Sequence, residues 1–251
     1  RLRESRYHTS RVHTSVTGRH LRAENSMASA DAISWRIPVG GQETSALFQP
    51  GFREPGTLFV CAHGAGGHMR DRGMDQVAAA LHGRGLSLLR FNFLYKEKGS
   101  SRPDPMPLLE QTIEAVVQRA RSEIAPGTLI IGGRSMGGRA ASMLVSRGCD
   151  SDGLLLLAYP LHPAGQPEKL RDAHLPAIAQ PVLCLNGTRD PLCNRELMEN
   201  VLQRVGPNWR MHWLEGADHS FHVLKSSGRT DAEVKHEAGD AVEGWLQEAV
   251  I

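Results

Sequence analysis

Three side chains suited to nucleophilic catalysis follow one another along the chain as serine, aspartate and histidine: Ser135, Asp190 and His219. Ser135 lies within Gly-Arg-Ser-Met-Gly at residues 133–137, directly after an apolar run at 128–131. The apolar run predicts a strand, and the small and apolar residues after the motif predict a helix. A serine on such a sharp turn is exposed above the strand end, where a histidine base with an acidic partner can activate its hydroxyl.

The acidic partner is predicted to be Asp190, which follows an apolar run at residues 181–187 that is typical of a strand. A carboxylate at a strand end can accept the imidazole N–H, set the tautomer of the ring and stabilise the imidazolium. Asp-Pro is also a common pair at the start of a turn, so residues 190–191 alone leave both interpretations open. The place of Asp190 in the series favours the acid.

The base is predicted to be His219, which lies in the loop after an alternating run at residues 209–214. Two other histidines compete for this role: His222 in the same loop and His212 on the predicted strand. The loop position after the last strand favours His219. It would take the proton of the serine and return it to the leaving group.

A glycine-rich loop at residues 63–67, His-Gly-Ala-Gly-Gly, follows a predicted strand at 57–62. Such a loop leaves backbone N–H groups free to bind a developing oxyanion. Ala65 or Gly66 would supply one donor and Met136, the residue after the serine, the other. An ordinary strand-to-helix turn is the alternative for this loop, and the histidine at its start is expected to orient the loop rather than to react.

Together these features resemble the α/β-hydrolase superfamily, in particular its dienelactone-hydrolase-like branch. The resemblance is greatest to the group that includes the human testis-expressed protein 30 and the hydrolase-like domain of the KAT8 regulatory complex subunit 3. It implies an α/β-hydrolase fold with a mostly parallel central sheet, helices on both faces and a minimal cap. Dienelactone hydrolases typically carry cysteine where this chain has Ser135, so their lactone substrate is not implied. The resemblance extends from about residue 33 to the C-terminus and rests on residues 63–66, 133–139, 159–163, 186–190 and 216–221.

The rest of the chain predicts the elements of one α/β domain over residues 27–251. A pair of antiparallel strands comes first, joined by Gly40 and Gly41, and strands then alternate with amphipathic helices. Asn194 is expected to cap one of these helices. The expected strands are 33–39, 44–49, 86–93 and 154–158, and the expected helices are 74–81, 108–124, 195–205 and 232–250.

The segment between residues 158 and 181 would shape the substrate site. It is proline-rich and too short for the helical cap domain of larger hydrolases, which predicts an open or shallowly covered site. Tyr159 and His162 are candidate substrate-binding residues, with packing of the loop as the alternative. Residues 95–98 could form another rim, although a solvated turn is the preferred interpretation.

Composition predicts an ordinary soluble globular protein: 40% of the residues are hydrophobic and 22% are charged. No apolar run approaches the roughly 18 residues that span a bilayer. Of the four cysteines, Cys61 and Cys184 lie in predicted buried strands, and none has disulfide-framework or metal-ligand spacing. A reducing cytoplasmic setting is therefore expected, without a membrane, nucleic acid, metal or cofactor.

The segment 1–26 differs from the rest, with six arginines against two glutamates and almost no apolar periodicity. This composition predicts disorder. An organelle transit peptide is one interpretation. The preferred one is an extension foreign to the natural chain, which would then start at Met27.

The function predicted from these residues is hydrolysis of a small-molecule carboxylic ester or thioester through an acyl-enzyme on Ser135. Amides and transfer to an alcohol stay open, because nothing in the sequence identifies the leaving group. The alternative from another class is a hydrolase-like scaffold or interaction protein with an unused site. A peptidase is disfavoured, because the chain has no propeller or cap domain. The oligomeric state is left undetermined.

Overall fold

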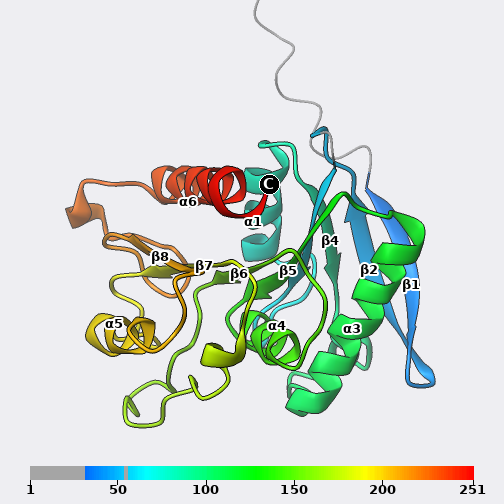
Figure 1. The fold of residues 1–251 in the computed structure, drawn as a ribbon, viewed down its shortest axis with the longest axis horizontal. Coiled ribbons are helices and arrows are strands. Elements are labelled where there is room, and N and C mark those ends of the chain that lie inside the picture. The colour runs from blue at the N-terminus through cyan, green and yellow to red at the C-terminus, as the bar shows by residue number, and fades with distance from the viewer. Residues whose placement is uncertain (1–31, 54–55) are drawn as a thin grey trace, which may run out of the picture. The chain divides into compact units, whose positions relative to one another are not determined.

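The computed structural model describes residues 32–53 and 56–251. The segment 1–26, with its predicted role as a leader or extension, lies outside them. The centre of the described part is an eight-stranded sheet with the order β1-β2-β4-β3-β5-β6-β7-β8 (Figure 1). Its strands are β1 (Ile33–Val39), β2 (Gln42–Gln49), β3 (Thr57–Ala62), β4 (Ser87–Phe91), β5 (Thr128–Arg134), β6 (Gly153–Leu157), β7 (Val182–Gly187) and β8 (Trp209–Leu214).

Strands β3 to β8 run parallel to one another, whereas β2, near one edge, pairs antiparallel with both of its neighbours, β1 and β4. The predicted mostly parallel sheet is therefore confirmed. Every residue of β3, β6 and β7 is buried, as expected for strands covered on both faces, whose sequences read as nearly continuous apolar runs. The hairpin turns at Gly40 and Gly41, both with positive φ.

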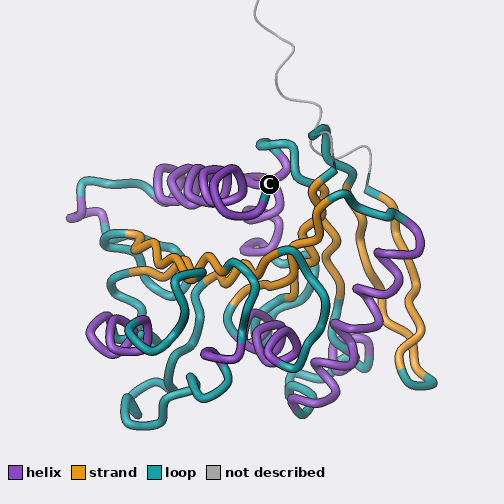
Figure 2. Tube along the Cα trace, viewed as in Figure 1, coloured by secondary structure: helices purple, strands orange, loops and turns teal. Residues whose placement is uncertain are grey.

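Helices cover both faces of the sheet (Figure 2). One face carries α1 and α6, and the other carries α3, α4 and α5. Asn194 caps α5 as predicted, because its side chain accepts the Leu197 amide at 3.1 Å. Among residues 32–53 and 56–251, no helix has the length and apolar character needed to cross a bilayer. The α-helices are α1 (Arg72–His82), α2 (Leu94–Glu97), α3 (Met106–Glu123), α4 (Met136–Ser146), α5 (Arg195–Leu202) and α6 (Asp231–Trp245), and a π-helical turn, η3 (Leu246–Val250), follows α6.

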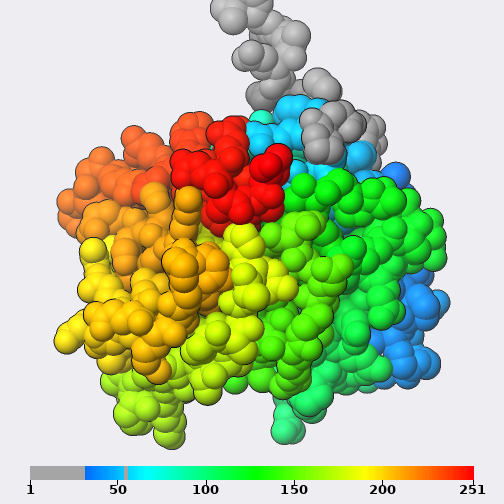
Figure 3. Space-filling model, viewed as in Figure 1, coloured from blue at the N-terminus to red at the C-terminus, as the bar shows by residue number. Residues whose placement is uncertain are grey.

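The segment between β6 and β7 contains only one short 3-10 turn, η1 (Leu175–Ala177). It contains no helical cap domain, in agreement with the sequence. In the space-filling view its yellow-green surface protrudes below that of α5 (Figure 3). The surroundings of the strand ends are therefore built from an irregular loop rather than from a lid domain.

The prediction of a solvated turn at residues 95–98 is wrong for two of its side chains. These residues belong mostly to α2, in which Tyr95 is buried. The Glu97 carboxylate accepts a hydrogen bond from the Asn92 side chain at 2.8 Å and one from the Ser45 hydroxyl at 3.0 Å. Glu97 thus ties β2 to the end of β4. The local sequence does not reveal this contact, because it joins segments that are far apart in the chain.

Backbone packs directly on backbone where β5 turns into α4. A Cβ on Gly137 would lie 2.6 Å from the carbonyl oxygen of His63, and one on Gly133 would lie 2.2 Å from that of Ala62. Gly133 also has a φ of +146°, a conformation that side chains disfavour. Glycine is therefore required here for the turn that carries Ser135 to contact the loop after β3.

A buried histidine joins this loop to the neighbouring strand end. The Nδ1–H of His63 donates to the Gly64 carbonyl at 2.8 Å, and its Nε2 accepts the Phe93 amide at 3.1 Å. Burial lowers the pKa of His63 to about 4. The ring is thus neutral and engaged on both nitrogens, which agrees with an orienting role.

Replacing Gly137 by alanine is expected to lower the free energy of unfolding by about 1–3 kcal/mol, because the new methyl group meets backbone that has little room to move. Gly244→Ala in α6 is the matched control, since its Cβ would meet nothing within 4 Å. That change should be neutral or stabilising by up to about 1 kcal/mol. Urea denaturation of both variants checks this, and equal effects would contradict the packing described.

Protonation of His63 should make the stability of the fold depend on pH. In the unfolded chain this histidine binds a proton with a pKa near 6.5, whereas the folded protein resists protonation until about pH 4. Between these values the unfolded state binds more protons, so lowering the pH from about 6.5 to 4 destabilises the fold, by at most about 1.4 kcal/mol per pH unit for one histidine.

Denaturant titrations at several pH values would measure this slope. His63→Asn should reduce it, whereas Val60→Ala, which removes methyl groups from an equally buried site on β3, should lower stability without changing the slope. An unchanged slope in His63→Asn would contradict the expectation.

Candidate functional site

Ser135, Asp190 and His219 lie in loops at the C-terminal ends of three strands. Ser135 joins β5 to α4, Asp190 follows β7, and His219 follows β8. In the sheet only β6 separates β5 from β7, and β8 is the neighbour of β7. Loops after parallel strands gather at one edge of the sheet. The topology thus brings together side chains that are up to 84 positions apart in the sequence.

The three side chains form a continuous hydrogen-bonded series. His219 Nε2 lies 2.9 Å from Ser135 Oγ, and His219 Nδ1 lies 2.8 Å from Asp190 Oδ2. Because a carboxylate only accepts hydrogen bonds, Nδ1 carries the proton and Nε2 accepts the serine hydroxyl. This is the arrangement in which an imidazole can remove the serine proton.

The backbone of Ser135 is held in an unusual conformation, with φ 50° and ψ −117°. A positive φ in a residue other than glycine is strained and is common at functional turns. The Ser135 amide donates to the Leu157 carbonyl at 2.8 Å, which ties the turn to the end of β6. Since α4 starts at the next residue, the positive end of its dipole lies beside the serine.

The Asp190 carboxylate is fully buried and accepts two further hydrogen bonds. The Leu192 amide donates to Oδ1 at 2.8 Å, and the Asn186 side chain donates to Oδ2 at 3.1 Å. Asn186 is itself fixed by the backbone of Tyr159, with one bond to its amide and one to its carbonyl, each 3.0 Å long. Sequence reasoning missed Asn186. The available signal was a polar residue near the end of an otherwise apolar strand.

Arg134 is a second residue that sequence reasoning missed. Its Nη2 donates to the His219 carbonyl at 3.0 Å, so the residue before the serine positions the loop that carries the histidine. The same guanidinium packs against Gly73 at the start of α1, where a Cβ would lie 2.3 Å from Nη1. The sequence shows that Arg134 belongs to the Gly-Arg-Ser-Met-Gly motif, but it does not reveal the contact with the His219 carbonyl.

A cavity of about 340 Å³ opens beside Ser135 and is also lined by Ala65 and Met136. Within the described parts of the chain, the Ala65 and Met136 amides have no backbone acceptor. Two backbone donors predicted from the sequence therefore border the same cavity as the serine hydroxyl.

Gly66, the other candidate donor of this loop, is placed differently. It does not line the cavity, and its amide lies beside the hydroxyl of the buried Tyr95. Burial raises the pKa of Tyr95, and the Gly66 amide opposes that shift. The hydroxyl nevertheless has no partner at regular hydrogen-bond geometry within the described residues. The geometry thus favours Ala65 over Gly66 as an oxyanion donor.

Tyr159 and His162 are not among the residues that line the cavity beside Ser135, and their expected contact with substrate stays a prediction. Tyr159 is buried, and its hydroxyl donates to the Arg171 carbonyl at 2.6 Å. His162 Nδ1 donates to the Pro163 carbonyl at 3.0 Å, and Nε2 accepts the Asn194 amide at 3.0 Å. Both side chains hold the segment between β6 and β7 in place, which was the alternative interpretation.

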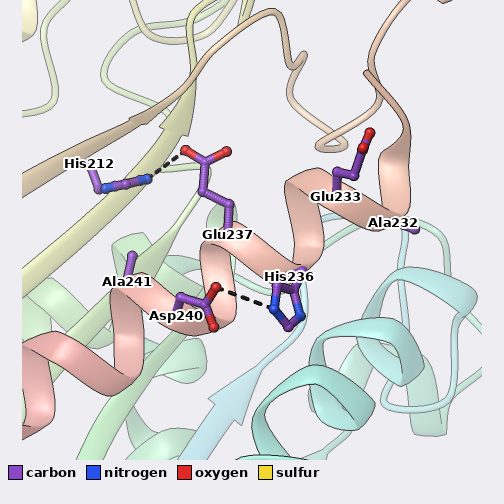
Figure 4. Close-up of a pocket in the computed structure, with 7 residues that line it drawn as sticks. All are labelled: His212, Ala232, Glu233, His236, Glu237, Asp240 and Ala241. Atoms are coloured by element: carbon purple, nitrogen blue, oxygen red, sulfur yellow. Dashed lines mark hydrogen bonds and ion pairs between the residues drawn. The ribbon is translucent and has the colours of Figure 1, made fainter. Parts of the chain in front are cut away.

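The two competing histidines lie elsewhere. His222 Nδ1 bonds to Asp231 at 3.0 Å. His212 lies on β8, as expected, and bonds to Glu237 at 2.9 Å beside an open hollow of about 580 Å³ between β8 and α6 (Figure 4). This hollow shares no residue with the cavity at Ser135, and its two histidines pair with Glu237 and Asp240. Within residues 32–53 and 56–251, no three His, Cys, Asp or Glu side chains form a potential metal site.

Solved structures with the same fold come from several hydrolases. An α/β serine hydrolase homologue from Coxiella burnetii matches with a TM-score of 0.69 and 20% identity, over 84% of this chain and 98% of its own. A dienelactone hydrolase from Anabaena variabilis matches with 0.69 and 17% identity, over 88% and 99%. An esterase from Pyrococcus furiosus matches with 0.68 and 16% identity, over 91% and 96%. At these identities the likeness concerns the fold.

The sequence itself matches a family model. The model for the alpha/beta hydrolase domain covers residues 55–247, from just before β3 to just after the end of α6. It thus includes the loop after β3, the turn at Ser135 and both loops with Asp190 and His219. The match does not identify the narrower testis-expressed and regulatory-subunit group, which stays a prediction. The chain belongs to the α/β-hydrolase family.

Proposed function

We propose that the protein is a serine hydrolase that cleaves a carboxylic ester or thioester through an acyl-enzyme on Ser135. The observation that carries the proposal is the hydrogen-bonded series Ser135–His219–Asp190, whose serine lines a cavity with two free backbone donors. Membership of the α/β-hydrolase family and the fold shared with an esterase support it.

In the first half-reaction Ser135 Oγ attacks the substrate carbonyl while His219 Nε2 takes its proton. The oxyanion binds the Ala65 and Met136 amides, and a single donor of this kind has been worth about 2.7–4 kcal/mol elsewhere. Asp190 holds the ring and stabilises the imidazolium. When the intermediate collapses, the bond to the leaving group breaks, and His219 gives that group its proton.

In the second half-reaction water attacks the acyl carbon with His219 again as the base, and the acid leaves as Ser135 regains its hydrogen. The buried hydrogen bonds of Asp190 and the link from Arg134 to His219 keep the imidazole aligned through both steps. No step needs a metal or an organic cofactor. A cavity of about 340 Å³ without a lid domain suits a small ester.

Treatment with a fluorophosphonate should add one covalent group to the wild-type protein, detected by intact mass, because this probe reports an activated serine whatever the substrate. Ser135→Ala should give no adduct. His219→Ala and Asp190→Asn should label more slowly, by about 10²-fold or more for loss of the base.

Ser146→Ala is the matched control, since Ser146 lies on the same helix α4 but hydrogen-bonds to the Met143 carbonyl. It should label at the wild-type rate. If the folded wild-type protein gives no adduct, the hydrolase proposal fails and the scaffold alternative replaces it.

A further inference from the structure

Two arginines border the cavity beside Ser135. Arg139 lies one turn further along α4, and its amide donates to the Ser135 carbonyl at 3.0 Å. Arg171 comes from the segment between β6 and β7. Both line the same cavity of about 340 Å³ as the serine, and both are partly buried. A pair of positive charges from separate segments thus borders the cavity next to the serine.

Neither arginine has an acidic partner within residues 32–53 and 56–251. Arg139 Nε is buried and makes no hydrogen bond there. Arg171 makes one long side-chain bond, from Nη1 to the Pro160 carbonyl at 3.4 Å. Elsewhere in the domain most arginines form ion pairs, which is the usual arrangement when a guanidinium is partly buried. The ion-paired arginines are 36, 53, 84, 90, 119, 121, 147, 195, 204, 210 and 229.

The groups around these two arginines leave the charge uncompensated. Burial and the nearby Arg139 lower the pKa of Arg171. Burial and the same arginine lower the pKa of His174 to about 4, so that ring is neutral. Burial also raises the pKa of Tyr159, which keeps its hydroxyl uncharged.

Three acidic side chains of the neighbouring elements already have partners. Asp190 bonds to His219, Asp172 pairs with Arg204 at 2.5 Å, and Glu110 pairs with Arg147. Two guanidinium groups that line one cavity without a counter-ion are unfavourable in the free protein. An oxyanion bound between them would offset this repulsion and accept hydrogen bonds from both guanidinium groups.

We propose that Arg139 and Arg171 bind an oxyanionic group of the substrate, a carboxylate or a phosphate, next to the ester that Ser135 attacks. This inference rests on the proposed function and names its substrate class. The planar guanidinium matches both anions with paired N–H donors. The enzyme would therefore prefer half-esters, whose second acidic group stays ionised, over neutral esters of the same size.

Turnover of matched acid and amide substrates tests the preference. One pair varies the acyl side, monoethyl glutarate against monoethyl glutaramate, and one varies the alcohol side, para-butanoyloxybenzoate against para-butanoyloxybenzamide. In at least one pair the wild-type kcat/KM should be higher for the acid. The acid-to-amide ratio should fall about 10- to 100-fold in Arg139→Gln and in Arg171→Gln, the loss expected for a charge-assisted hydrogen bond.

Two further variants separate this effect from a general loss of charge. Arg139→Lys keeps the charge but not the planar fork, so it should retain part of the ratio. Arg119→Gln removes a positive charge from the exposed surface of α3 and should leave the ratio unchanged. A wild-type protein that reacts with fluorophosphonate but shows no acid preference in either pair would keep the hydrolase proposal and overturn this one.

Binding without turnover provides the independent test. Isothermal titration of Ser135→Ala with glutarate, butyl phosphate and neutral glutaramide should show binding of at least one anion and not of the diamide. The anion that binds more tightly identifies the substrate group as a carboxylate or a phosphate. Adding Arg139→Gln to the Ser135→Ala variant should abolish this binding. If the anion binds but the wild-type serine is unreactive, the anion site stands and the hydrolase proposal fails. If neither anion binds, the inference is overturned.

Discussion

The close approach of two backbone segments is the constraint on which the candidate site depends. The turn after β5 lies against the end of β3 because Gly133 and Gly137 have no side chains to separate them. That contact puts the strained Ser135 next to the loop of residues 63–67, so the serine hydroxyl and the free amides of Ala65 and Met136 border one cavity. Any side chain at these glycines would move the serine, and the Met136 amide with it, away from Ala65.

Burial of polar groups fixes the rest of the geometry. Asp190 and Asn186 are buried and bonded to each other and to neighbouring backbone, which leaves them no freedom to rotate. A neutral His63 joins the loop after β3 to the end of β4 in the same way. In a low-dielectric interior each such group is costly unless its hydrogen bonds are made. The loops around Ser135 are therefore held by polar contacts where a lid domain is absent.

The charges of the site are arranged unequally. Its acidic groups, such as Asp190, have partners inside the protein. The positive charges of Arg139 and Arg171, in contrast, have no acidic partner among the described residues. A protein stabilised only for folding would gain by pairing or removing them. We attribute the imbalance to the anionic substrate group proposed above, because both arginines line the cavity beside Ser135.

Much of this protein could be predicted from its sequence. Apolar runs such as 57–62 identify strands because burial on both faces leaves an unbroken hydrophobic pattern. Asn194 was identifiable as a cap because capping depends on its near neighbours. The order of Ser135, Asp190 and His219, each after a strand of the parallel sheet, also predicted that they would meet, since parallel strands end at one edge.

What the sequence alone determined was thus local pattern and chain order: which segments are strands or helices, and which side chains can react. Only the tertiary structure decided the contacts between distant segments. It bonded Tyr159 and His162 to distant backbone, tied Asn186 to Asp190, and placed Arg139 and Arg171 on one cavity without a counter-ion. The reason is physical: a side chain's direction and partners depend on packing between elements, which no short stretch of sequence encodes.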